Sequence, residues 1–243
     1  MQRPSMGQRR RPNPRGEGGR LREEIIAAAV QLIGRLGNIE AVSLRGVARE
    51  AGIDPMSIYR HFADKEELVW AVLDTEFAEL ARALDAAAAG FDAPADRLRA
   101  RCLGYVRFGL ERRGEFLVLF GTEGRPRPPE GGPELLPGWP VFAALLDDVD
   151  RCLTAGRTTP STDARTQATL LWAALHGLTV LRLSKKGFPW PPIEDLVDRL
   201  LGELVLNRPQ GSSARPRVGS GGAESRLCAP AVPVIGAEQG PNG

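Results

Sequence analysis

Apolar residues recur at three- and four-residue spacing through most of this 243-residue chain, between about residues 21 and 207. This spacing lines one face of an α-helix with apolar side chains. Nowhere does the chain show the sustained apolar–polar alternation, rich in β-branched residues, that is typical of strands. We therefore expect an all-α fold. The pattern predicts nine helices, at about 21–36, 44–51, 55–61, 65–88, 94–112, 115–121, 138–156, 163–185 and 192–207.

Helix boundaries are marked by residues suited to helix ends. Ser43, Asp54 and Asp64 each precede an apolar-periodic segment, where a side-chain oxygen can accept a hydrogen bond from the first turn. Gly37 and Gly52 follow the first and second segments, where a helix end favours glycine. These positions predict where the first four helices begin and end.

Three stretches are rich in Gly and Pro and lack apolar periodicity. The first 20 residues and residues 208–243 are expected to be disordered, and residues 121–140 are expected to form a long internal loop. Neither a long uncharged apolar run nor a secretory signal is present, so we expect a cytoplasmic protein.

Charge is distributed unevenly, although the formal net charge is only +2. The first 20 residues carry six arginines and one acidic residue. Residues 1–70 carry 12 basic and 9 acidic residues, whereas residues 71–207 carry 16 basic and 19 acidic residues. The chain thus has a basic N-terminal part and an acidic helical body. The arginine-rich arm fits contact with a DNA backbone or minor groove, and a solubilising tail is the alternative.

Residues 43–61, SLRGVAREAGIDPMSIYRH, predict two short helices joined by a tight turn. Val47, Ala48 and Ile58 can form a small shared core, and Gly52 tolerates the positive φ of the turn. This is the pattern of a helix-turn-helix, whose second helix can enter a major groove. An ordinary helical hairpin with a solvated outer face is the alternative interpretation.

The surrounding sequence closely resembles the N-terminal domain of TetR-family transcriptional repressors. The resemblance rests on S-L-R-x-V-A-x-x-A-G at 43–52 and IYRHFADKEEL at 58–68. More loosely, LLWAALHGLTVL at 170–181 resembles the Trp-x-x-x-His-Gly motif in one class of C-terminal ligand domains of that family, and residues 105–120 resemble the helices before it. The resemblance implies a three-helix helix-turn-helix domain (21–68) and a larger helical ligand-binding and dimerisation domain (69–207). Composition adds a disordered basic arm before them (1–20) and a disordered tail after them (208–243).

The resemblance also implies roles for individual residues. Met56, Ser57 and Arg60 would face bases, with Arg60 suited to a bidentate contact to guanine. Met56 departs from the small residue or proline often found there in the family. The other implied contacts, mostly to phosphates, are Ser43, Arg45, Tyr59, His61 and Lys65. Lys65 would act with the amides of the helix it begins. Each of these residues has a plainer alternative as a solvated or packed side chain.

The acidic body has more apolar surface than one chain needs. On about 192–207, two adjoining apolar stripes run along the helix, and about 163–185 is apolar almost all round, with Gly177 permitting close approach. In the family, such a surplus is covered by a second copy, forming a homodimer that reads a palindromic DNA operator. Purely intramolecular burial is the alternative.

An effector pocket is expected within the same body. Its candidate lining is Tyr105, Phe108, Phe120, Phe142, Trp172 and His176. Such a lining suits a small, partly hydrophobic molecule that releases the repressor from DNA. Each residue has a core-packing alternative, and a DNA-binding dimer without a small-molecule ligand is the alternative function. Activation of transcription also stays open.

Enzymatic residues are not gathered anywhere in the sequence. There are only two histidines, and no P-loop, dinucleotide fingerprint, nucleophile elbow or zinc motif occurs. Asp147, Asp148 and Asp150 are expected on a solvated helix face. We expect no catalysis, no cofactor and no metal.

Overall fold

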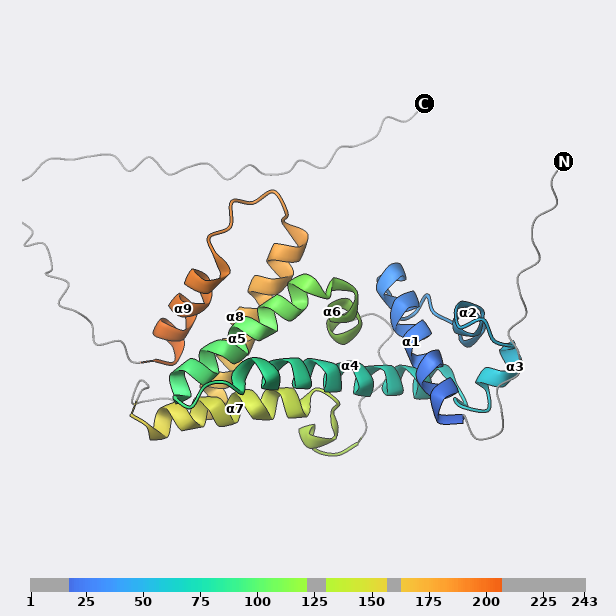
Figure 1. The fold of residues 1–243 in the computed structure, drawn as a ribbon, viewed down its shortest axis with the longest axis horizontal. Coiled ribbons are helices and arrows are strands. Elements are labelled where there is room, and N and C mark those ends of the chain that lie inside the picture. Colours follow the sequence, from blue (N-terminus) through green and yellow to red (C-terminus); the bar gives the residue numbers. More distant parts are fainter. Residues whose placement is uncertain (1–17, 122–129, 157–162, 207–243) are drawn as a thin grey trace, which may run out of the picture. The chain divides into compact units, whose positions relative to one another are not determined.

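The computed structural model describes residues 18–121, 130–156 and 163–206. Within these ranges the chain forms nine α-helices and one short 3-10 helix, with no strand (Figure 1). The all-α prediction is therefore confirmed. The elements are α1 (Gly18–Leu36), α2 (Leu44–Glu50), α3 (Pro55–Ile58), α4 (Lys65–Ala88), α5 (Pro94–Glu111), α6 (Arg113–Phe120), η1 (Pro133–Leu135), α7 (Trp139–Thr154), α8 (Ala164–Ser184) and α9 (Ile193–Leu204).

Most predicted boundaries agree with the observed ones within two or three residues, with two instructive differences. Helix α1 begins at Gly18, three residues before the predicted start. Helix α3 ends at Ile58 instead of residue 61, because the chain tightens into a turn in which the His61 amide donates to the Ile58 carbonyl at 3.0 Å. The predicted arm before residue 18 and the tail after residue 206 lie outside the described residues.

The three predicted N-caps are confirmed by side-chain hydrogen bonds. Ser43 Oγ accepts from the Gly46 amide at 3.1 Å, and Asp54 Oδ1 accepts from the Met56 amide at 2.8 Å. Asp64 Oδ1 accepts from the Glu67 amide at 2.8 Å. Each bond satisfies a backbone donor that the helix itself leaves unpaired. These caps fix the starting points of α2, α3 and α4.

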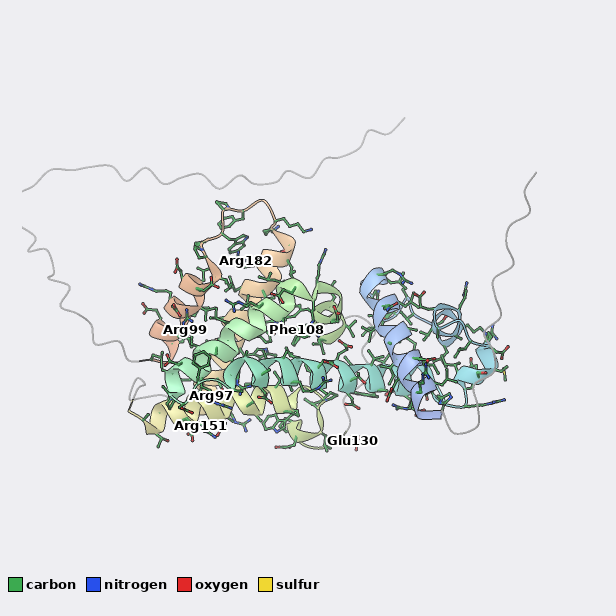
Figure 2. All side chains as sticks on the ribbon, viewed as in Figure 1. Arg97, Arg99, Phe108, Glu130, Arg151 and Arg182 are labelled. Atoms are coloured by element: carbon green, nitrogen blue, oxygen red, sulfur yellow. The ribbon has the colours of Figure 1, made fainter. Side chains whose placement is uncertain are left out.

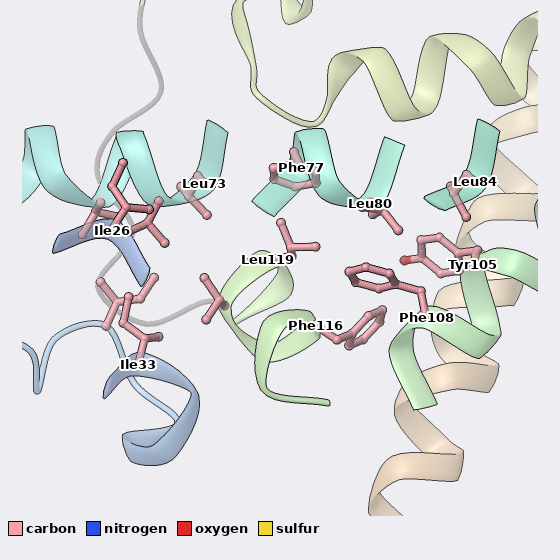
Figure 3. Packing of buried hydrophobic residues seen from close by; sticks show 14 of the residues in the cluster. Ile26, Ile33, Leu73, Phe77, Leu80, Leu84, Tyr105, Phe108, Phe116 and Leu119 are labelled. Carbon is pink, nitrogen blue, oxygen red and sulfur yellow. The ribbon is translucent and has the colours of Figure 1, made fainter. Parts of the chain in front are cut away.

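Helix α4 connects the two ends of the described fold (Figure 1). Its N-terminal half packs against α1, and the rest contacts α5, α6 and α7. Figure 3 shows Phe77, Leu80 and Leu84 along α4, facing Phe116, Leu119 and Tyr105 from α5 and α6. One continuous apolar core thus joins the helices around the helix-turn-helix to those of the larger body.

Helices α1 and α6 approach closely at a pair of glycines. A Cβ placed on Gly34 would lie 3.3 Å from the Cα of Gly114, which is tighter than an ordinary contact. The absence of a side chain at Gly34 lets the two backbones come together, whereas a Cβ on Gly114 would lie at an ordinary 3.8 Å from the Gly34 Cα. Helix α6 is therefore held directly against the first helix of the N-terminal domain.

Asp148 is a correction to the sequence analysis. It was expected on a solvated helix face, but its side chain is fully buried between α5 and α7. Arg97 Nε donates to its Oδ1 at 2.8 Å, and Arg101 Nε donates to its Oδ2. Arg101 also donates to Asp85 at 2.8 Å. Buried carboxylates need such partners, and the periodicity of α7 could not reveal arginines on another helix.

None of the helices in the described ranges is long and apolar enough to cross a membrane.

Candidate functional site

The helix-turn-helix unit is built from α2, α3 and the turn between them. Gly52 adopts φ 67°, the left-handed conformation that the turn requires. The Ile53 amide then donates to the Ala48 carbonyl at 2.9 Å. Val47, Ala48 and Ile58 are fully buried, as predicted for the shared core of the two helices. This packing fixes the direction in which the outer side of α3 points.

The predicted base-contacting residues lie on α3 and in the turn that follows it. Met56 is 70% exposed and Tyr59 is 45% exposed, so Tyr59 is not a core residue. Arg45 and Arg60 are exposed, and within the described part of the chain neither forms an ion pair. Such side chains are available to a ligand with negative charge.

The remaining candidates of this surface are less uniform. Ser43 is exposed, but its hydroxyl caps α2. Ser57 and His61 are half-buried. Arg60 and His61 lie in the turn after Ile58 and not in α3 itself, because the helix ends earlier than predicted.

Lys65 is placed differently from the predicted phosphate clamp. Its Nζ donates to the Glu40 carbonyl at 3.0 Å. The Glu67 amide, one of the first amides of α4, is already bonded to Asp64. Glu67 Oε2 in turn accepts from the Ala63 amide at 2.7 Å, so the start of α4 is closed by reciprocal bonds. Any phosphate contact at this point would come from the Lys65 ammonium, without the Glu67 amide.

Two contacts that the sequence did not reveal brace the unit. Arg35 of α1 donates from both terminal nitrogens to the two carboxylate oxygens of Glu50 on α2, at 2.8 and 2.7 Å. The Arg22 guanidinium lies 4.8 Å from the ring centroid of Phe62, which is fully buried. Both pairs join residues far apart in sequence, where spacing carries no signal.

A cavity of about 860 Å³ lies among α4, α5, α6, α7 and α8. This volume is within the range of small-molecule sites. The wall is mostly apolar and rich in aromatic rings. Four of the six predicted residues line it: Tyr105, Phe120, Phe142 and Trp172.

Phe108 and His176 were also predicted to line the cavity but do not. Phe108 is only 5% exposed and packs beneath the Arg112 guanidinium, 5.3 Å from its ring centroid. His176 lies behind Tyr105, with Nδ1 3.0 Å from the Tyr105 hydroxyl oxygen, and its ring stacks on Phe116. His176 therefore supports the lining from behind, through Tyr105 and Phe120.

The sequence did not indicate several of the residues that line the cavity. Trp70 and Phe77 come from α4, Arg101 from α5 and Arg165 from the first turn of α8. Trp139, which falls within the stretch expected to be a loop, begins α7 and also lines the wall. Periodicity showed that these helices had apolar faces, but it could not show which faces meet around a space.

Polar groups at the cavity wall are largely bonded within the protein. Trp172 Nε1 donates to the Tyr105 hydroxyl at 3.4 Å, and the same hydroxyl bonds His176 Nδ1. Burial raises the pKa of Tyr105 and lowers the pKa of His176, so both are uncharged near neutral pH. Among the described residues, no group of three or more potential metal ligands is gathered.

Known protein families match both parts of the chain. Residues 25–72 match the family described as bacterial regulatory proteins, tetR family, and residues 98–204 match the tetracyclin repressor-like C-terminal domain. Together these ranges cover more than half of the chain.

Curated relatives match the N-terminal part. The HTH-type transcriptional regulator BetI of Brucella suis biovar 1 is 35% identical over 79 residues, which is 32% of this chain and 39% of that protein. BetI of Brucella melitensis biotype 2 is 34% identical over 79 residues, with the same coverage. The match thus spans about two fifths of these relatives.

Solved structures match over most of the chain. A protein of unknown function from Rhodococcus sp. RHA1 superposes with a TM-score of 0.65 and 25% identity, covering 80% of this chain and 100% of that one. A TetR family transcription regulator from Marinobacter aquaeolei VT8 gives 0.64 at 21% identity with the same coverage, which bears on the fold. With both family matches and the helix-turn-helix geometry, the chain belongs to the TetR family of bacterial regulatory proteins.

Proposed function

We propose that this protein is a homodimeric repressor that binds a palindromic operator and is released from it by a small, partly hydrophobic effector. The observation that carries the ligand response is the aromatic cavity of about 860 Å³. A DNA-binding dimer controlled without a ligand has no use for such a space, which costs packing energy when empty. The cavity therefore favours the ligand-responsive function over that alternative.

The proposed contacts to DNA are exposed and half-buried residues of the helix-turn-helix and of the start of α4. Arg60 and Ser57 would contact base edges, together with the exposed Met56 side chain. Tyr59 and Lys65 would hold phosphates. The remaining proposed phosphate or groove contacts are Ser43, Arg45 and His61. Phosphate contacts position the unit, and only base contacts select the sequence.

Support for a second copy comes from the outer face of α8. Leu170, Val180 and Leu181 are 52%, 42% and 47% exposed. Gly177 lies on the same helix, and a Cβ there would meet no described atom within 4 Å. An apolar helix face with a glycine at its centre suits packing against the same face of a partner. On α9, one predicted stripe, with Val197 and Leu201, is buried within the chain itself.

The proposed link between cavity and DNA runs through α4 and α6. Trp70 and Phe77 of α4 and Phe120 of α6 line the cavity. The same two helices contact α1, and α6 does so at the Gly34–Gly114 approach. An effector that shifts either helix would move the helix-turn-helix units of the dimer relative to each other and weaken operator binding.

The test is release from DNA by compounds, compared between two variants. Val141 lines the cavity and is half-buried, so Val141→Trp would fill part of the space. Leu135 is 58% exposed and outside the lining, so Leu135→Trp is the control. Compounds that release the native protein and the control from operator DNA should fail to release Val141→Trp. Equal release of all three would contradict an effector site in this cavity.

A further inference from the structure

We infer that the effector is an anion: a largely apolar molecule whose single negative group is held by Arg165 at one end of the cavity. This inference rests on the proposed effector site and adds the chemical class of its occupant. It depends on which charges the cavity wall contains and on which of them are already neutralised.

Where the structure describes the lining, it contains positive charge and no negative charge. Among the described residues that line the cavity there is no Asp or Glu, whereas Arg101 and Arg165 both contribute to the wall. A cationic effector would therefore meet repulsion and no counter-charge. A neutral or anionic molecule is compatible with this wall.

The two arginines differ in what they already bind. Arg101 is 3% exposed and donates to the carboxylates of Asp148 and Asp85. Its positive charge is compensated, and its role in the wall is structural. Arg165 forms no ion pair within the described ranges, although Asp163 is two residues away. The Asp163 carboxylate instead accepts from the Thr166 amide at 2.9 Å and from the Thr166 hydroxyl at 2.6 Å.

Arg165 is oriented by an aromatic ring of the same wall. Its guanidinium carbon lies 5.7 Å from the ring centroid of Trp139, which also lines the cavity. Stacking on the ring face leaves the N–H groups at the guanidinium edge available for an oxyanion. The Arg165 guanidinium is thus held next to the apolar cavity by the Trp139 ring.

Aromatic rings lead from this end toward the interior. Trp139 contacts Phe142 at 5.8 Å between centroids, and Phe142 contacts Trp172 at 6.0 Å. The Trp172 indole donates to the Tyr105 hydroxyl, which also bonds His176. The polar groups in this part of the wall are therefore already hydrogen-bonded within the protein. An apolar body would lie along these rings while its negative group remains at Arg165.

A matched pair of probes tests the inference on the full chain. 1-Anilinonaphthalene-8-sulfonate and N-phenyl-1-naphthylamine share the same aromatic body, and only the first carries a negative group. The native protein should bind the anionic probe about three- to tenfold more tightly, a modest ratio because Arg165 is exposed. Arg165→Gln should remove this preference while leaving the affinity for the neutral probe unchanged.

The control variant is Arg182→Gln. Arg182 lies on the same helix (Figure 2). It also stacks 5.7 Å from a tryptophan ring, that of Trp190, but it is outside the cavity lining. Its replacement should leave the preference intact, and Val141→Trp should weaken both probes. A preference that survives Arg165→Gln, or probe binding unaffected by Val141→Trp, would overturn the inference. Because no DNA is present, failure here would leave the proposed DNA-binding function untouched, and that function is tested separately by selection from random DNA.

Discussion

Gly34 of α1 lies so close to Gly114 of α6 that a Cβ on Gly34 would be 3.3 Å from the Gly114 Cα. The two glycines join the N-terminal domain to α6, and two residues at the other end of α6, Leu119 and Phe120, line the cavity. The proposed ligand response depends on this junction, because it is where a change at the cavity wall meets the domain that carries the helix-turn-helix.

Gly34→Val should push α6 away from α1. The added side chain meets backbone, which cannot move aside as a flexible side chain would, and overpacking of this kind costs about 1–3 kcal/mol. The free energy of unfolding, measured by urea denaturation, should fall by about that amount. Gly19→Val is the control, since a Cβ at Gly19 on the same helix meets nothing within 4 Å. Equal stability of the two variants would show that the junction is loose.

Arg60→Ala should impair DNA recognition while leaving the fold and the dimer intact. Arg60 is exposed and without an ion pair in the described ranges, so its removal opens no cavity. Loss of one bidentate base contact costs about 1–3 kcal/mol per half-site. Operator affinity, measured by fluorescence anisotropy, should fall accordingly.

Arg82→Ala provides the comparison for Arg60. Arg82 is on the surface of α4, paired with Glu79, and its loss should not change operator affinity. If Arg60→Ala still selects the operator preferred by the native protein from random DNA, the role assigned to Arg60 is wrong.

Leu181→Asp should separate the dimer into monomers. Leu181 is 47% exposed on α8, in the face proposed to meet a second copy. Burying an unpaired carboxylate there would cost about 3 kcal/mol or more. Sedimentation velocity should show a change from dimer to monomer for Leu181→Asp. It should show no such change for Leu135→Asp, because Leu135 is 58% exposed outside that face. If Leu181→Asp remained a dimer, the dimer interface would not include this face of α8.

Glu76 makes stability depend on pH. Burial, with repulsion from Glu115 and Glu79, raises its pKa from 4.5 to about 7. The folded protein therefore holds a proton that the unfolded chain releases near pH 4.5, and stability falls as pH rises between these two values. Glu76→Gln removes the cost of ionisation, so it should match the native protein near pH 4.5 and be more stable at pH 8 by about 1–3 kcal/mol.

Thermal unfolding of Glu76→Gln at the two pH values checks this prediction. Glu111→Gln is the control, because Glu111 is exposed at the end of α5. A stabilisation of Glu76→Gln that is equal at both pH values would mean that ionisation of Glu76 is not responsible.

Local signals in the sequence were enough to predict the helices and the helix-turn-helix. Ser43, Asp54 and Asp64 cap the helices they were expected to cap, because capping depends on residues within one turn. The positive φ of Gly52 follows from the same local reasoning. The predicted end of α3 was wrong, because the chain tightens into a turn after Ile58.

The cavity was only partly predictable, since it depends on how five helices meet. Phe108 and His176 had the right residue types, but neither lines the cavity: Phe108 packs beneath Arg112, and His176 lies behind Tyr105. Nothing in the sequence near Arg165 indicates that its guanidinium lies 5.7 Å from the ring centroid of Trp139, a residue 26 positions earlier on another helix. Asp148 became a buried ion-pair partner through arginines 47 and 51 residues away, a separation that no periodic pattern encodes.

The most direct test of the account is selection of DNA from a random pool by the full-length protein, followed by footprinting of the selected sequence. A dimer with two recognition units predicts an inverted repeat, protected on both halves, with half-site centres about 34–36 Å apart or a multiple of one helical turn. A selected site without two-fold symmetry, or protection of a single half-site by one chain, would contradict the dimeric repressor proposed for this protein.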